Sequence, residues 1–189
     1  MKKLLFLGAL LFFTTAAFAQ SQWKVDPFHS SLNFTVKHNN ISMVNGKFTD
    51  YTGNLVTNGE DLKDARFDFT IQTTSINTNV EPRDNHLRSA EFFDVEKYPT
   101  LKFKSTKLLK SGKPDHYLLY GELTINDVTK EVIADLYYGG TLKTDEEERI
   151  GMKAKAVINR LDYGIDFDPT GLGIGKNVHI EVHLQFVKQ

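Results

Sequence analysis

The chain has 189 residues, with 23 Lys or Arg against 24 Asp or Glu, and it contains no cysteine. This balance argues against nucleic acid and anionic membrane surfaces as electrostatic partners. Without disulfides the hydrophobic core must stabilise the fold unaided, and a chain of this length suffices for one domain.

Residues 1–19 have the features of a secretory signal peptide. Lys2 and Lys3 form a positive start, residues 4–13 form an apolar run, and Ala17-Phe18-Ala19 resembles a cleavage site. The apolar run is too short to cross a membrane as a helix. We therefore expect cleavage after Ala19 and export to the periplasm or the medium. Losing Lys2 and Lys3 lowers the formal charge from −1 to −3, because no acid is lost with them.

After a short segment at 23–29 that Pro27 interrupts, apolar and polar residues alternate through most of the chain. Leu32, Phe34 and Val36, for example, share one face, with Ser30 and His38 in phase at its two ends. Asn126-Asp127 suits a tight hairpin, and Gly53 suggests a bulge. We predict eight strands, at residues 31–38, 46–57, 64–76, 100–109, 115–125, 129–141, 149–159 and 177–188.

Alternation of this kind gives every strand one apolar face and one solvated face. A single closed sheet satisfies all of them without an exposed edge, so we predict an all-β, eight-stranded antiparallel barrel. A two-sheet sandwich has the same pattern and is the alternative. An eight-stranded barrel can be filled by its side chains or can hold one small ligand. The predicted lumen residues are Leu32, Phe34, Val36, Phe67, Phe69, Ile71, Leu101, Phe103, Leu119, Leu123, Ile125, Leu136 and Ile158.

The stretch 83–100 breaks the alternation. Ser89 suits the cap of a short helical turn over 90–95, and Pro99 favours a return to extended chain. We therefore expect a short helical insert over one end of the barrel, opposite the glycine-rich loop 171–175. The predicted mouth or lid residues are Ser30, His38, Arg83, Asp84, His86, Leu87, Phe92 and Phe93.

Two groups of reactive residue types suggest enzyme chemistry. Asp26, His29 and Ser30 are the residue types of a hydrolase triad, but they lie within five residues and lack the glycines of a nucleophile elbow. In the insert, Arg83, Asp84 and His86 could form an acid–base group, or brace the insert through salt bridges. We favour the structural interpretation of both groups: the first for the spacing just given, and the second because no nucleophile or metal site accompanies it.

A third group, His179, Glu181 and His183, shares one face of the last strand and could hold a metal. That face lies opposite five apolar residues and should be the solvated outside of the barrel. We therefore expect no catalytic residues, no metal and no resident cofactor.

Several segments resemble the YceI-like family of polyisoprenoid-binding proteins. They are Trp23-x-x-Asp26-x-x-His29-Ser30, Arg83-Asp84-x-His86-Leu87-Arg88-Ser89, Phe92-Phe93-Asp94-Val95 and Ile158-Asn159-Arg160-x-Asp162-Tyr163-Gly164-Ile165. Asn126-Asp127 departs from the Arg-Gly usual in the family, at a hairpin turn. The resemblance covers almost all of residues 20–189. It implies an exported, lipocalin-like barrel whose apolar lumen holds an isoprenoid quinone or another polyprenyl lipid, without an established enzyme activity.

The function expected from the sequence is therefore binding of a long-chain isoprenoid or similar amphiphilic lipid, for periplasmic transport, storage or sequestration. The partner is a hydrophobic, chain-like small molecule and not nucleic acid. Transient membrane contact and a homodimer stay open. Two other classes of function also stay open, which are an enzyme acting on a lipid-like substrate in the same pocket and an interaction module without a ligand.

Overall fold

The structure, a computed structural model, describes residues 20–58 and 61–189, so the predicted signal peptide lies outside the described residues. The described part is almost entirely β-structure, with one short α-helix, α1 (Glu81–Arg88), and two 3₁₀ turns, η1 (Thr73–Ser75) and η2 (Arg160–Tyr163). None of its helices is long and apolar enough to cross a membrane. The strands are β1 (Gln20–Val25), β2 (Ser31–His38), β3 (Ser42–Phe48), β4 (Tyr51–Asn58), β5 (Asp61–Gln72), β6 (Ile76–Asn77), β7 (Thr100–Lys110), β8 (His116–Ile125), β9 (Val128–Lys143), β10 (Glu148–Asn159) and β11 (Ile174–Lys188).

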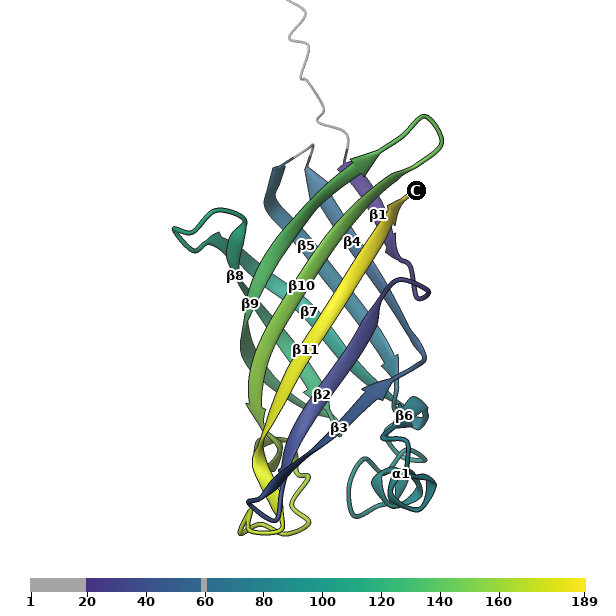
Figure 1. Ribbon diagram of the computed structural model, residues 1–189, viewed down its shortest axis with the longest axis vertical. Coiled ribbons are helices and arrows are strands. Elements are labelled where there is room, and N and C mark those ends of the chain that lie inside the picture. Colours follow the sequence, from purple (N-terminus) through teal and green to yellow (C-terminus); the bar gives the residue numbers. More distant parts are fainter. Residues whose placement is uncertain (1–19, 59–60) are drawn as a thin grey trace, which may run out of the picture.

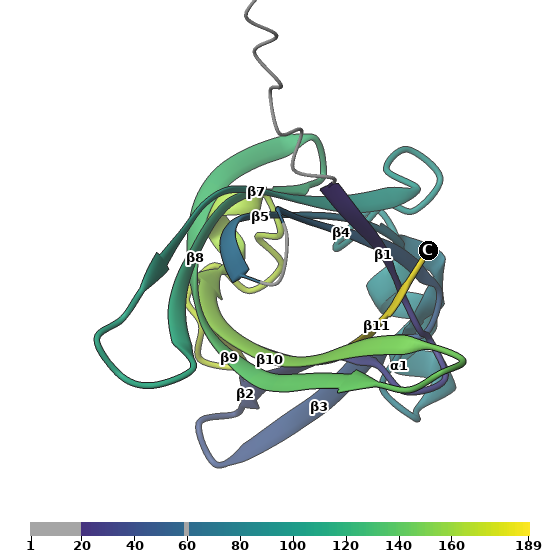
Figure 2. The same cartoon turned by 90° about the horizontal axis from the view of Figure 1, so that it is seen from above.

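The strands close into an antiparallel barrel, as Figures 1 and 2 show. The ring runs β1-β4-β5-β7-β8-β9-β10-β11, and β11 returns to pair with β1, which makes eight strands. The predicted fold class is confirmed. Beyond its contact with β1, the same edge of β11 pairs with β2. β2 pairs with β3, and β3 pairs with β6, at the lower end of Figure 1. The segment predicted as a lead-in, residues 23–29, therefore contains the second half of a strand of the ring, β1.

Local sequence explains the regular parts of the barrel. In β4 the burial alternates strictly from Tyr51 onward, as a strand with one core face requires. Asn126 and Asp127 both have positive φ, of 51° and 58°, which matches the tight hairpin predicted between β8 and β9. Gly53 is not a bulge, because it pairs in register with Phe69, and the irregularity lies further along β4 between Val56 and Asn58.

Buried side chains of the hydrophobic core cluster at the end of the barrel opposite the insert. Trp23, Leu55, Leu62, Ile150 and Phe186 are all buried there. The Trp23 indole donates a hydrogen bond to Thr57 Oγ1 at 3.1 Å, so its polar edge is satisfied inside this cluster. We call these five buried side chains the plug, because they close one end of the barrel.

The lower end carries the insert. Its helix is α1, so the helical turn predicted over 90–95 is wrong in position. Pro82 stands in the first turn, where its missing N–H costs nothing. Ser89 stands at the C-terminal end of α1, whereas the prediction placed it at the start of a helical turn. The chain after Ser89 forms hydrogen-bonded turns, and Phe92 N donates to Ser89 O at 3.1 Å. The sequence signal failed because α1 is mostly polar and has no apolar periodicity.

Candidate functional site

Between the plug and the insert, the barrel encloses a cavity of about 580 Å³. Ligand pockets in proteins span roughly 300–1,000 Å³, so the volume suits a small molecule. Every residue predicted to face the lumen lines this cavity, from Leu32 on β2 to Ile158 on β10. Their role in binding a ligand stays a prediction.

Side chains of small volume leave this space open. Ala134, Ala154 and Ala156 line the wall, where larger residues would fill the lumen. Three lumen phenylalanines lean over glycines of the neighbouring strand, so that a Cβ at each glycine would stand 2.2–2.5 Å from a ring carbon. Rings in this position lie along the wall and do not cross the lumen. The three pairs are Phe34 over Gly46, Phe69 over Gly53 and Phe103 over Gly121.

The sequence prediction omitted part of the cavity wall. β11 contributes Val178, Ile180, Val182 and Leu184, whose alternation is visible in the sequence. Ile165 lines the cavity from the loop before β11, and Ile174 lines it from the first position of β11. No periodic pattern marks Ile165, since a loop has no repeating geometry.

Three segments meet around the lower end of the cavity. Arg83, His86, Leu87 and Phe93 line it from the insert, and His38 lines it from the end of β2. The β2–β3 turn is tied to the loop before β11, because Asn39 N donates to Gly173 O at 2.7 Å. The loop in turn contacts the insert through a ring cluster of His86, Phe92 and Phe167, whose centroids lie 4.9–5.0 Å apart. The structure thus brings together the three segments predicted to surround a mouth.

Two predicted mouth residues do not line the cavity. Asp84 is buried behind the helix, where its Oδ1 accepts hydrogen bonds from the Thr78 backbone at 2.8 Å and the Thr78 hydroxyl at 2.5 Å. The same hydroxyl accepts from Arg83 Nε at 2.7 Å. Asp84 and Arg83 therefore hold α1 against the chain before it through hydrogen bonds to Thr78, and not through the salt bridges predicted for them.

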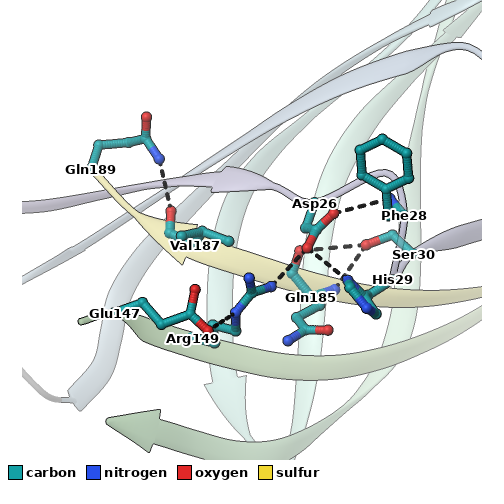
Figure 3. Close-up of polar contacts among 9 residues, drawn as sticks. All are labelled: Asp26, Phe28, His29, Ser30, Glu147, Arg149, Gln185, Val187 and Gln189. Carbon is teal, nitrogen blue, oxygen red and sulfur yellow. Dashed lines mark hydrogen bonds and ion pairs between the residues drawn. The ribbon is translucent and has the colours of Figure 1, made fainter. Parts of the chain in front are cut away.

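Ser30 lies at the other end of β2 from His38, so its placement at the mouth is wrong. Its Oγ accepts a hydrogen bond from Gln185 N at 2.9 Å and so joins the break between β1 and β2 to β11 (Figure 3). Beside it, Asp26 Oδ2 lies 2.8 Å from His29 Nδ1 and 2.7 Å from Arg149 Nη1. No hydrogen bond joins His29 to Ser30, so these residues do not form a hydrolase triad.

The Asp26 carboxylate is strongly stabilised by this network. The hydrogen bond from His29 has the largest effect, with further bonds from Arg149 and from Phe28 N, and together they hold the pKa of Asp26 at about 2. Asp26 therefore carries a negative charge that fastens the β1–β2 break to β10. The network is a structural tie between strands.

The group considered for a metal is also occupied by other contacts. Glu181 Oε2 lies 2.8 Å from Lys155 Nζ, and Oε1 lies 2.9 Å from Lys153 Nζ and 3.1 Å from His183 Nε2. These ion pairs, first that with Lys155, lower the pKa of Glu181 to about 2. Within residues 20–58 and 61–189, His, Cys, Asp and Glu form no cluster of three or more with metal-binding geometry.

The sequence reasoning gave no role to Arg160, which organises the loop before β11. Its side chain is buried, and its three nitrogens donate to the carbonyl oxygens of five residues at 2.6–3.1 Å. Burial lowers the pKa of this guanidinium. The bonded carbonyls belong to Ile165, Phe167, Asp168, Ile174 and Gly175. Arg160 therefore fixes the loop that carries Phe167 to the insert.

Comparison with known proteins places these features in a family. A model of the YceI-like domain matches residues 23–186. The Protein YceI of Salmonella newport is 35% identical over 168 residues, which cover 86% of each chain. Among solved structures, the YCEI protein of Campylobacter jejuni superposes with a TM-score of 0.72 at 26% identity, over 95% of this chain and 97% of that one.

Two more distant structures share the fold. BcnA of Burkholderia cenocepacia has a TM-score of 0.75 at 17% identity, over 85% of this chain and 98% of that one. A polyisoprenoid binding domain from Saccharophagus degradans has a TM-score of 0.67 at 18% identity, over 90% of this chain and 98% of that one. From the match over residues 23–186 and the 35% identity to Protein YceI, the chain belongs to the YceI-like domain family.

Proposed function

We propose that this protein binds a long-chain isoprenoid or a similar amphiphilic lipid in its barrel lumen, for transport, storage or sequestration in the periplasm. The observation that carries the proposal is the shape of the cavity. It holds about 580 Å³ between the plug and the insert, and apolar side chains form most of its wall. A chain-like apolar molecule fits such a space, with its polar end left near the insert.

The name of one structural neighbour supports this ligand class. The domain from Saccharophagus degradans is a polyisoprenoid binding domain, and its fold matches over 90% of this chain. Its identity of 18% supports a shared architecture, so the ligand is carried over here as part of the proposal.

Energetics explain how such a ligand would be held and released. Burying each CH₂ is favourable by about 0.8 kcal/mol relative to water, so a chain of several isoprene units offsets the cost of ordering it. A bilayer offers nearly the same apolar environment. Transfer of the lipid into the lumen is therefore strongly favourable from water and only weakly favourable from a membrane. Selectivity and release then depend on cavity shape and on the groups at the mouth.

The test begins with native mass spectrometry and lipid extraction of the protein purified from the exported fraction. We expect a co-purifying chain-like lipid, and saturable uptake of a fluorescent polyprenyl analogue after delipidation. Ala154→Trp should abolish uptake, because it fills the lumen. Val157→Trp is the matched control, since Val157 is 55% exposed on the same strand. A lipid-free mass together with no uptake by the wild type would disprove the proposal.

A further inference from the structure

The ionisable residues that line the cavity are all basic. The described residues that line it include no Asp or Glu. The basic ones are Lys37, His38, Arg83, His86, Lys155 and Arg160. Lys155 is ion-paired with Glu181 on the outer face of the barrel, and His86 is paired with Glu91. The basic groups left to meet a ligand lie at the lower end of the cavity, where they attract negative charge.

The acids close to the mouth are turned toward protein donors. Glu91 Oε2 lies 2.5 Å from His86 Nε2. Asp84 accepts from Thr78, as described above. Asp168 accepts at 2.8 Å from the backbone N–H groups of Gly173 and Ile174, at the start of β11. These carboxylates are therefore already engaged by protein donors, and none of them forms an ion pair with Arg83.

Arg83 has donor capacity to spare. Its Nε and Nη2 donate to Thr78, at 2.7 and 2.9 Å, and no ion pair among the described residues includes it. Its other terminal nitrogen makes no hydrogen bond to a described residue. Arg160 differs, since all three of its nitrogens bond to backbone carbonyls. Of these two arginines, Arg83 is the one that can receive a ligand.

We propose that the lipid carries an anionic headgroup, a phosphate or a carboxylate, that pairs with Arg83, with His38 on the same side of the cavity at the end of β2. This inference rests on the proposed function. A half-buried guanidinium beside an apolar lumen is stabilised by a counter-charge, and arginine suits phosphate and carboxylate oxygens. The pairing also favours this lipid in the lumen over the same lipid in a bilayer, which burial of the apolar chain alone does not.

The experiment compares ligands that share one chain and differ in the headgroup. Polyprenyl phosphate and the matching polyprenol, then a long-chain fatty acid and the matching alcohol, compete against a neutral fluorescent polyprenyl analogue. We expect the anionic member of at least one pair to bind the wild type about tenfold tighter or more, as a charge-assisted hydrogen bond allows. The preferred pair identifies the headgroup as phosphate or carboxylate.

Variants then test the role of Arg83. Arg83→Gln should bring the affinity ratio of the preferred pair to about one, while Arg83→Lys keeps part of the preference because the charge remains. Arg66→Gln is the matched control, because Arg66 is exposed on the outer face of β5 and does not line the cavity. Raising the salt concentration should reduce the preference in the wild type.

The outcomes separate this inference from the proposed function. Equal affinities within both pairs in the wild type would overturn the anionic headgroup and leave lipid binding intact. A preference that survives in folded Arg83→Gln would overturn the role of Arg83. Inorganic phosphate that displaces the probe as well as the polyprenyl phosphate would also overturn the inference, because the chain would then be irrelevant. No binding by any lipid would disprove the proposed function itself.

Discussion

The ring of Phe34 lies over Gly46 on the neighbouring strand, so that a Cβ on Gly46 would stand 2.2 Å from the Phe34 Cζ atom. Phe34 and Gly46 are direct partners in the β2–β3 register, and both face the interior. The glycine therefore provides the space in which the ring lies against the wall. The volume of the lumen therefore depends on the absence of a side chain at position 46.

Gly46→Ala should force the Phe34 ring inward and reduce the space for a ligand. Overpacking of this kind costs about 1–3 kcal/mol of unfolding free energy. We expect a lower melting temperature and weaker uptake of a polyprenyl analogue, measured by thermal denaturation and fluorescence titration. Gly151→Ala is the control, since a Cβ at Gly151 meets nothing within 4 Å.

The double variant Gly46→Ala, Phe34→Leu separates this mechanism from a general effect of alanine in a strand. With the ring removed, adding the methyl group should cost much less than it does in the wild type. Equal costs in the two backgrounds would show that the ring contact is not the cause.

The alternation of the sequence predicted the strands and thirteen residues that line the lumen, and the closed sheet was preferred over a sandwich because it leaves no exposed edge. The alternation was not enough to interpret the glycines. Gly53 suggested a bulge, yet it pairs regularly and makes room for Phe69. A glycine looks the same in a sequence whether it bends a strand or accommodates a ring from the strand beside it. That distinction depends on strand register, which the sequence of one strand does not contain.

The ends of the barrel were harder to predict than its wall. Trp23 belongs to the plug, although its strand is short and Pro27 lies just beyond the end of that strand. Ser30 is in phase with the lumen face of β2, and this phase predicts a place at the mouth, but phase does not tell which end of a strand is open. Arg160 acts through backbone carbonyls. Every residue type has a backbone carbonyl, so no sequence motif indicates these partners.

The Asp26 network predicts a pH-dependent contribution to stability. The folded pKa of Asp26 is about 2, below its ordinary value of 3.8. Its contribution is therefore complete above pH 3.8 and is lost as the pH falls toward 2. Relative to the wild type, Asp26→Asn should lose on the order of 1 kcal/mol at neutral pH and almost nothing near pH 2, measured by denaturant unfolding at each pH.

Asp68→Asn is the control for this prediction, because Asp68 is exposed on β5 and forms no ion pair with any described residue. Its difference from the wild type should stay small across the same pH range. A constant loss for Asp26→Asn at every pH would show that the network stabilises the fold by packing and not by charge.

Arg160→Lys should destabilise the loop before β11. A lysine has three donors on one atom and cannot reach carbonyls that five residues direct at a planar guanidinium. The carbonyls left unpaired cost roughly 2–5 kcal/mol in total. We expect a lower melting temperature and faster amide hydrogen exchange in residues 164–175. Unchanged exchange in that loop would contradict the role assigned to Arg160.

Phe69→Asp should abolish lipid binding. Phe69 lines the cavity and packs edge-on against Phe186 of the plug at 6.1 Å, so an unpaired charge there is costly to bury. Thr70→Asp is the matched control, because Thr70 points the other way on the same strand. Circular dichroism establishes folding and fluorescence titration measures binding. Retained binding in a folded Phe69→Asp protein would place the ligand elsewhere.

The insert should control how fast a lipid enters and leaves. Phe92 is buried against His86 and Phe167, and Phe93 packs edge-on against Phe48 at 5.9 Å. These contacts join the insert to the β2–β3 side and to the loop before β11, while the long wall of the cavity lies on other strands. Changing Phe92 and Phe93 to Ala should therefore speed exchange with vesicles more than it weakens equilibrium binding.

The measurement is transfer of a fluorescent polyprenyl analogue to acceptor vesicles, beside an equilibrium titration of the same protein. Phe167→Ala should share the faster exchange, because Phe167 is the partner of Phe92 across the mouth at 5.0 Å. Phe28→Ala should have no effect, since Phe28 is 93% exposed and follows β1, away from the insert. If the double variant folds and exchanges at the wild-type rate, the insert is only a structural connection, and the lipid passes through another part of the barrel.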